Sequence, residues 1–301
     1  MILKVENLTK KYGNFLALDK VSFQINQGDI FGFLGPNGSG KTTTIRILAT
    51  ISRADSGTVI LDGHNLFTNP NYVRSIINYM PESFGLYGWM SAEEYLKMFS
   101  NVYKVKYQDD LLKSVGLGEN RKQNISTFSR GMKQRLGFAR SLINSPKLLL
   151  LDEPTSGLDP LGRIEIQDLL KQINKTKGIT ILLSTHLLDD VDRLCNRIAI
   201  INKGKIVEEG KLEELEEFGA QRLLVRTSKK PNKILKIPDV DLSILDEGYL
   251  IELHRKATIN ETLEILIENK IDIQEVVAQK RKIEDLFIEN IKTQNNEKRL
   301  H

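Results

Sequence analysis

The segment Gly35–Thr42 is the first part of the chain whose residue types and spacing point to chemistry. It reads Gly-Pro-Asn-Gly-Ser-Gly-Lys-Thr, which fits the phosphate-loop pattern G-x-x-x-x-G-K-[ST]. The apolar run Asp29–Leu34 precedes it and a helix is expected after it, so that backbone N–H groups and a helix N-terminus would face the phosphates. A glycine-rich loop that matched the pattern by chance would not be expected to lie between a buried strand and a helix. We therefore interpret the segment as a nucleotide phosphate site.

Two side chains of this loop have specific roles in the pattern. Lys41 would contact the β- and γ-phosphates, and the Thr42 hydroxyl would ligate Mg²⁺. The residues predicted to bind the nucleotide here are Gly35, Pro36, Asn37, Gly38, Ser39, Gly40, Lys41, Thr42 and Thr43.

A pair of carboxylates, Asp152 and Glu153, follows the wholly apolar run Leu148–Leu151. Such a run is typical of a strand buried on both faces of a parallel sheet, so the two acids emerge at the strand end. Asp152 would belong to the Mg²⁺ shell, and Glu153 would polarise the attacking water. The alternative is an acid pair that caps a helix after a core strand. The phosphate loop elsewhere in the chain favours the catalytic interpretation.

Composition narrows the class of protein. The 301 residues contain 43 basic and 39 acidic side chains, a net charge of only +4, which gives no indication of a nucleic-acid-binding surface. The single cysteine, Cys195, excludes an internal disulfide and a cysteine-cluster zinc site. The apolar runs fall short of the roughly 20 residues of a membrane span, and Met1 leads directly into a strand-like run. We expect a cytoplasmic protein that does not span the membrane.

Strand-like and helical runs alternate along the first two thirds of the chain, which indicates an α/β fold. Helical character dominates from about residue 87 to residue 145, where Ser91 and Glu94 form a capping box. The expected strands are Leu3–Asn7, Val21–Ile25, Asp29–Leu34, Ser56–Asp62, Ile76–Met80, Leu148–Leu151, Ile179–Ser184, Arg197–Asn202 and Lys205–Glu208.

The pattern changes after Gly210. A charged helical linker, Lys211–Phe218, leads to a smaller unit of strands and helices, and we place the domain boundary near Phe218. The strands expected in this unit are 222–227, 235–237, 249–254 and 271–278, and the helices are 259–269 and 283–291.

The segment Phe128–Arg135 narrows the family beyond a P-loop NTPase. It resembles the signature segment of the ATP-binding subunits of ABC transporters, whose commonest form is LSGGQ. Ser129 and Gly131 match that form, whereas Phe128, Arg130 and Met132 depart from it. A serine at this place would also cap the following helix.

The resemblance extends over residues 1–217 and implies an α/β fold, a P-loop NTPase of ABC ATPase type. Such a fold has a mixed core sheet, an antiparallel β subdomain and a helical subdomain, here at about residues 87–145. Residues 218–301 would then form a small C-terminal accessory α+β domain.

The family's functional residues have counterparts at matching positions. Tyr12 would stack on adenine, Asp159 lies in the D-loop that follows Glu153, and His186 would contact the γ-phosphate and orient the water. Ser129 and Gly131 would bind the γ-phosphate of ATP held by the opposite subunit. The catalytic residues implied are Lys41, Glu153 and His186.

Glu82 occupies a position where the family usually has a glutamine that touches Mg²⁺ and the water. A carboxylate can still approach the metal, so the implied metal ligands are Thr42, Asp152 and Glu82, although Glu82 adds negative charge to the site. Glu82, the Ser-Arg-Gly-Met signature and the C-terminal unit together resemble the ATPases of ABC-2-type exporters, including those linked to antibiotic resistance and sodium extrusion.

The resemblance therefore predicts an ATPase that binds ATP and Mg²⁺ and acts as a homodimer or as one of two paired subunits. It would power a separate membrane permease, an exporter, at the inner face of the cell membrane, and it would bind no nucleic acid. One alternative is an ABC-type ATPase acting on DNA or the ribosome, but such proteins usually carry a coiled-coil insertion or two cassettes. Another alternative is a small-molecule P-loop kinase, which would lack the signature segment and the family's switch histidine, here His186. The transported substrate is not encoded in these motifs.

Overall fold

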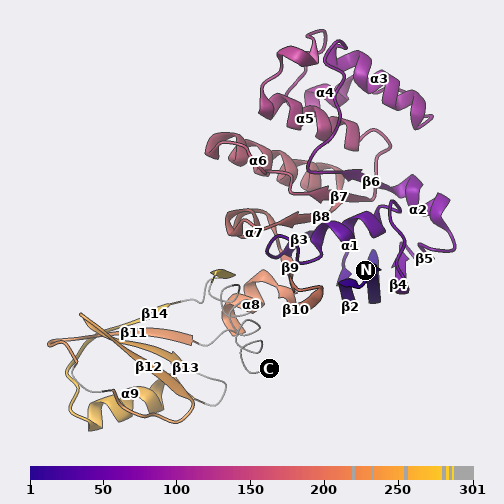
Figure 1. Cartoon of the computed structure of the whole chain (residues 1–301). Helices are drawn as coiled ribbons and strands as arrows, with labels where there is room; N and C mark the ends of the chain where they lie inside the picture. The colour runs from indigo at the N-terminus through magenta and orange to yellow at the C-terminus, as the bar shows by residue number, and fades with distance from the viewer. Residues whose placement is uncertain (219–220, 232–233, 254–256, 280–282, 285–286, 288–301) are drawn as a thin grey trace. The chain divides into compact units, whose positions relative to one another are not determined.

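The computed structural model describes residues 1–218, 221–231, 234–253, 257–279, 283–284 and 287 (Figure 1). The chain divides into two compact units, Met1–Gly210 and Lys211–His301, which we describe separately. Within the described residues, no helix combines the length and the apolar character that crossing a bilayer requires.

An antiparallel sheet opens the first unit, with strand order β2-β1-β4-β5. Its first two strands form a hairpin in which Leu3 pairs with Ile25 and Tyr12 pairs with Phe15, so a two-residue turn joins them. The strands are β1 (Leu3–Tyr12), β2 (Phe15–Ile25), β4 (Ser56–Leu61) and β5 (His64–Asn65).

A six-stranded sheet with the order β10-β9-β3-β8-β7-β6 forms the centre of the first unit. Every residue of β3, β7 and β8 is buried, which confirms the predicted strands covered on both faces. The strands from β9 to β6 pair in parallel, so their carboxyl ends lie at one edge, where ligands of α/β sheets bind. The six are β3 (Ile30–Leu34), β6 (Ile77–Met80), β7 (Leu148–Asp152), β8 (Thr180–Thr185), β9 (Arg197–Asn202) and β10 (Lys205–Lys211).

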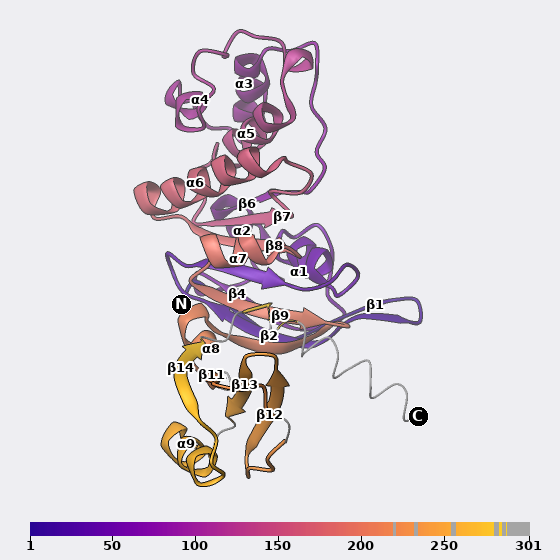
Figure 2. The same cartoon turned by 90° about the vertical axis from the view of Figure 1, so that its left-hand side faces the viewer.

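Helices cover these sheets and form a separate group at one end of the unit. Ile45, Ile47 and Leu48 of α1 share one apolar core with β1, β2 and β4 and with one face of the central sheet. Both views show α3, α4 and α5 gathered away from the two sheets (Figures 1 and 2), and the predicted capping box opens α3. The helices are α1 (Lys41–Leu48), α2 (Pro70–Ile76), α3 (Ala92–Val102), α4 (Asp110–Ser114), α5 (Arg130–Ser141), α6 (Pro160–Lys177) and α7 (Leu188–Leu194), with a 3₁₀ turn at Ile125–Thr127.

The second unit contains a four-stranded antiparallel sheet with the order β12-β13-β11-β14. Leu266 of α9 packs with Val225, Tyr249 and Ile251 of the sheet in one core. The elements are α8 (Leu212–Phe218), β11 (Gln221–Thr227), β12 (Val240–Leu245), β13 (Gly248–Leu253), α9 (Ile259–Glu268) and β14 (Ile273–Gln279).

Two expectations for this unit differ from the structure. The strand expected at 235–237 is only an isolated bridge from Ile237 to Val240, and the strand that follows it, β12, was not predicted. Residues of β12 alternate between half-buried and exposed positions, and the half-buried positions are the apolar residues Val240, Leu242 and Ile244. This alternation is the pattern of a strand with one covered face, so the sequence contains a signal for β12 that the prediction did not use. Most of the helix expected at 283–291 lies outside the described residues.

Candidate active site

The phosphate loop connects β3 to α1 at the carboxyl edge of the central sheet. Gly40 ends the loop with φ 113°, a left-handed conformation that side chains rarely adopt. A Cβ atom there would lie 2.7 Å from Leu18 Cδ2 and 2.9 Å from the Ala17 carbonyl oxygen. Glycine is therefore required both by the backbone conformation and by the close approach of β2.

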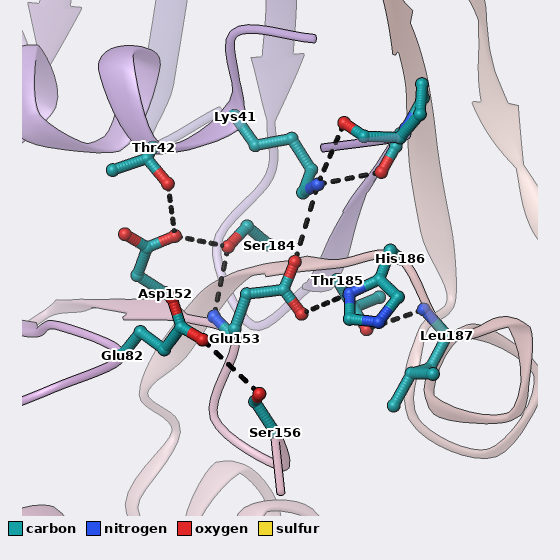
Figure 3. A network of polar contacts seen from close by, with 12 residues as sticks. Lys41, Thr42, Glu82, Asp152, Glu153, Ser156, Ser184, Thr185, His186 and Leu187 are labelled. Carbon is teal, nitrogen blue, oxygen red and sulfur yellow. Dashed lines mark hydrogen bonds and ion pairs between the residues drawn. The ribbon is translucent and has the colours of Figure 1, made fainter. Parts of the chain in front are cut away.

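Lys41 is buried, and its ammonium group lies inside the loop (Figure 3). Nζ donates to the carbonyl oxygens of Gly35 at 2.7 Å and Pro36 at 3.3 Å, and it lies 3.4 Å from Glu153 Oε1. The Ser39 hydroxyl is also buried and makes no hydrogen bond within the described residues. A buried cation and an unsatisfied hydroxyl in one loop suit a phosphate ligand, which would supply the missing acceptors.

Asp152 ends β7 and faces the beginning of α1. Its Oδ1 accepts hydrogen bonds from Thr42 Oγ1 at 3.0 Å and from Ser184 Oγ at 2.7 Å (Figure 3). Tyr79 of β6 lies 3.5 Å from the other carboxylate oxygen, and burial together with the negative charge of Asp152 raises the pKa of this tyrosine. The adjacent hydroxyl and carboxylate oxygens of Thr42 and Asp152 are the hard donors that Mg²⁺ prefers, so these residues fit that ion.

Glu153 and His186 come from neighbouring strand ends and meet directly. His186 Nδ1 lies 2.9 Å from Glu153 Oε2, and Ser184 Oγ accepts a hydrogen bond from the Glu153 backbone N–H at 3.1 Å (Figure 3). Glu153 is buried, whereas the His186 side chain is 42% exposed. A buried carboxylate between a lysine and a histidine, at the mouth of a phosphate loop, can accept a proton from water that enters from the exposed side.

Glu82 is exposed, and its carboxylate contacts the segment after Glu153. Its Oε1 accepts a hydrogen bond from Ser156 Oγ at 3.3 Å, and Arg130 Nη2 donates to the Ser156 carbonyl oxygen at 3.2 Å. No hydrogen bond within the described part of the chain joins Glu82 to Asp152 or Thr42. Glu82 and Arg130, two of the residues that depart from the family pattern, thus both contact Ser156.

The comparisons with known proteins decide the family. A protein-family model described as "ABC transporter" matches residues 18–156. The bacitracin transport ATP-binding protein BcrA of Bacillus licheniformis is 35% identical, and the alignment covers 96% of this chain and 97% of that protein. The lantibiotic transport ATP-binding protein SrtF of Streptococcus pyogenes is 40% identical over 74% of this chain and 98% of its own length. The chain belongs to the ATP-binding subunits of ABC transporters.

Solved structures agree with this assignment. An ATP-binding subunit of an ABC transporter aligns with a TM-score of 0.63 at 30% identity, covering 72% of this chain and 92% of that structure. The ATP-binding cassette MJ0796, in a dimer bound to ADP and Pi, aligns with a TM-score of 0.62 at 27% identity, covering 70% and 99%. The predicted ABC ATPase fold and ATPase activity are confirmed, and the alternative of an ATPase acting on DNA or the ribosome is not favoured.

Three further predicted site residues of this ABC ATPase lie on exposed surfaces of the single chain. Tyr12 is 50% exposed at the end of β1, with Lys10 Nζ 5.3 Å from the ring centre. Ser129 caps α5 by accepting from the Met132 N–H at 3.2 Å, as the capping interpretation expects. Asp159 caps α6 in the same way. The fold therefore brings together the phosphate-loop and strand-end residues, while these three face solvent.

Sequence reasoning missed several polar residues that surround the ATPase site. Ser184 joins the Asp152 carboxylate to the Glu153 backbone, and Asp190 collects hydrogen bonds from Thr155, Thr185 and Gln167. In the sequence, Ser184 is visible only as a polar residue near the end of an apolar strand, and Asp190 only as a polar residue among the apolar positions of a helix. That signal does not distinguish a buried polar group from an exposed one.

Proposed function

We propose that this ATPase powers a separate permease that exports antibiotics of the kind handled by its relatives. The observation that carries this proposal is the alignment over 97% of the bacitracin transport protein, which includes the second unit as well as the cassette. The ABC-2-type features of the sequence, Glu82 and the Ser-Arg-Gly-Met signature, support the same branch. The protein would then act at the inner face of the cell membrane, held there by the permease.

The test is drug susceptibility. Deleting the gene should lower the minimum inhibitory concentration of bacitracin or of a lantibiotic severalfold. A plasmid carrying the wild-type chain should restore resistance, whereas the Glu153→Gln chain should not. Unchanged susceptibility to both compounds, with the permease still expressed, would rule out this substrate class.

For hydrolysis, we propose that the chain's own residues act as follows. The phosphate loop and Lys41 hold the β- and γ-phosphates of ATP and offset their charge. Thr42 and Asp152 would hold Mg²⁺, which neutralises phosphate charge when bound. Glu153 takes a proton from the attacking water, and His186, 2.9 Å away, fixes the direction of that carboxylate.

We further propose a dimer in which each ATP is completed by the partner subunit. Ser129 and Gly131 at the start of α5 would bind the γ-phosphate held by the opposite chain, where a helix N-terminus favours an anion. The exposure of Tyr12 and of Ser129 in the single chain supports this role, since both surfaces remain available for nucleotide. The D-loop, Pro154–Asp159, would lie along the interface.

A surface of exposed apolar side chains on the helical part supports docking of the permease. The largest exposed fraction is that of Trp89. The members of this surface are Tyr87 at 46% exposure and Trp89 at 74%, whose ring centres lie 6.1 Å apart. We call it the aromatic surface, and we propose that it contacts cytoplasmic segments of the permease.

The scheme assigns no role to the second unit, and we propose that its residues from about 218 onward form an accessory domain. Its sheet and α9 enclose an apolar core of their own. The unit would stabilise or regulate the dimer, and the ATP site should remain intact when it is removed.

A further inference from the structure

Asp190 is a buried carboxylate that the proposed hydrolysis scheme does not use. It lies in α7, and its relative exposure is 0%. Its neighbour Asp189 pairs with Arg163 at 3.7 Å, whereas the contacts of the Asp190 carboxylate within the described residues are hydrogen bonds from uncharged donors. Burying a carboxylate without a cation costs free energy unless donors surround it, so the identity of these donors matters.

Three donors converge on Asp190, each from a different segment. Oδ2 accepts from Thr155 Oγ1 at 2.6 Å and from Thr185 Oγ1 at 2.9 Å, and Oδ1 accepts from Gln167 Nε2 at 2.7 Å. All three donor side chains are buried, with at most 1% exposure. Thr155 belongs to the D-loop, Thr185 ends β8, and Gln167 lies in α6. One carboxylate therefore joins three segments of the fold.

Both threonines are next to residues of the candidate site. Thr155 is two residues after Glu153, and Thr185 immediately precedes His186. The Leu187 N–H donates to Thr185 Oγ1 at 3.0 Å, so the residues on both sides of His186 are tied together (Figure 3). Because one residue spans at most about 3.6 Å of chain, fixing these hydroxyls leaves little freedom for the reacting side chains.

We propose that Asp190 is a positioning residue of the ATPase reaction. Its Oδ2 atom accepts hydrogen bonds from both the D-loop and the end of β8, and so fixes the two segments relative to each other. The fixed segments in turn keep the Glu153 carboxylate in contact with His186 Nδ1. Hydrogen bonds to an ionised acceptor are stronger than neutral ones, which suits a fixed link between two loops. The inference rests on the proposed roles of Glu153 and His186.

The first test is Asp190→Asn, which keeps the shape but replaces one acceptor oxygen with a donor. We expect kcat to fall about 10- to 100-fold, because a displacement of about 1 Å at a reacting group has effects of that size. KM for ATP should change less than about threefold, since no hydrogen bond among the described residues joins the Asp190 carboxylate to the phosphate loop. Thr155→Val and Thr185→Val each remove one donor and should lower kcat in the same way but less. If Asp190→Asn does not fold, the two valine variants decide.

Asp29→Asn is the matched control. Asp29 is also buried, at 7% exposure, and accepts hydrogen bonds from the Asn26 N–H and the Asn196 side chain, but it precedes β3 at the opposite edge of the central sheet. This variant should lower Tm while kcat per folded molecule stays within about twofold. If Asp190→Asn lowers kcat no more than Asp29→Asn, or weakens ATP binding as much as it lowers kcat, the positioning role is wrong.

A double variant separates positioning from general damage. If Asp190 acts through Glu153, adding Asp190→Asn to Glu153→Gln should lower the residual rate no further, whereas independent effects would multiply. Multiplication would overturn the inference. Full activity of Glu153→Gln would overturn the proposed catalytic role and this inference together. An inactive Glu153→Gln beside a normal Asp190→Asn would overturn the inference alone.

Discussion

At the scale of single residues, Glu153 is held in an unusual backbone conformation. Its φ is 49°, in the left-handed region that a residue with a Cβ enters at a cost of about 1–2 kcal/mol. The Ser184 hydroxyl accepts the Glu153 N–H, and the side chain turns toward Lys41 and His186. A strained backbone conformation persists only where neighbouring contacts enforce it. The strain at Glu153 therefore agrees with a carboxylate that is positioned for a reaction.

The change Glu153→Gln tests this residue most directly. An amide keeps the size and polarity of the side chain but cannot accept the proton of water, so kcat should fall at least about 100-fold. ATP affinity should change little because the phosphate loop is intact, and ATP should hold the chain as a dimer. Phosphate release and size-exclusion chromatography measure the two effects. The control Glu264→Gln, in α9, should behave as wild type. Unchanged turnover of Glu153→Gln would show that Glu153 is not the base that accepts the proton of water.

At the scale of elements, α5 connects several parts of the site. Ser129 and Arg130 begin this helix, and Arg130 donates to the D-loop at Ser156. Near the other end of α5, a Cβ at Gly137 would clash with the ring of Phe84. Only glycine therefore lets the segment after Glu82 pack closely on this helix. A rigid displacement of α5 would therefore move the signature serine and the Glu82 segment together.

The aromatic surface on the helical part gives a prediction at the same scale. Trp89→Ala should weaken association with the permease by about 2 kcal/mol or more, because large aromatic side chains dominate interface energies. ATPase activity of the isolated subunit should remain within about twofold, since the ring contact of Trp89 among the described residues is with Tyr87 and not with a site residue. Co-purification with the permease measures the first effect. Ile51→Ala, at a residue 62% exposed beyond the end of α1, is the control, and equal retention of permease by both variants would contradict the docking proposal.

The anchoring of α3 predicts a dependence on pH. Glu93 accepts two hydrogen bonds from Arg121, at 2.8 and 2.9 Å, and pairs with Lys97, and these cations lower the pKa of Glu93 from 4.5 to about 2. A carboxylate whose pKa is lowered by folding stabilises the fold at pH values above its pKa in the unfolded chain. This contribution is lost as the pH falls from about 4.5 toward 2.

Glu93→Gln should therefore lower the free energy of unfolding by about 1 kcal/mol at pH 7. The difference between variant and wild type should shrink as the pH falls from 5 to 3, because wild-type Glu93 progressively loses its advantage. Urea unfolding at each pH measures it. Asp110→Asn, at an exposed residue of α4, is the control, and a difference that grows on acidification would show that the ion pairs are not its source.

At the scale of the whole molecule, the proposed dimer places parts of each ATP site on two chains. Ser129→Arg and Lys41→Ala should each abolish hydrolysis by a pure protein. A mixture should recover activity, because a mixed dimer has one site with an intact Lys41 on one chain and an intact Ser129 on the other. Phosphate release against mixing ratio measures the recovery. A mixture that stays inactive would show that Ser129 serves the nucleotide of its own subunit.

The sequence predicted the central sheet and the phosphate loop because each depends on local pattern. Runs such as Leu148–Leu151 have no polar residue and can only be buried, and the loop glycines with Lys41 form a contiguous motif. β12 was not predicted, although Val240, Leu242 and Ile244 alternate with polar residues as in a half-buried strand. The contacts of Glu82 with Ser156, and of Asp190 with Thr155 and Thr185, join residues far apart in the chain and have no local signature.

The sequence by itself determined the chemistry of this protein, namely a phosphate loop, an acid pair after a buried strand and a switch histidine, because each is a short motif with its own physical requirement. Only the tertiary structure decided which of these side chains meet. Parallel pairing of β3, β8 and β7 brings Lys41, Glu153 and His186 to one edge, and a buried carboxylate in α7 ties two of their segments together. Distances across a sheet depend on strand order and register, which no local pattern contains.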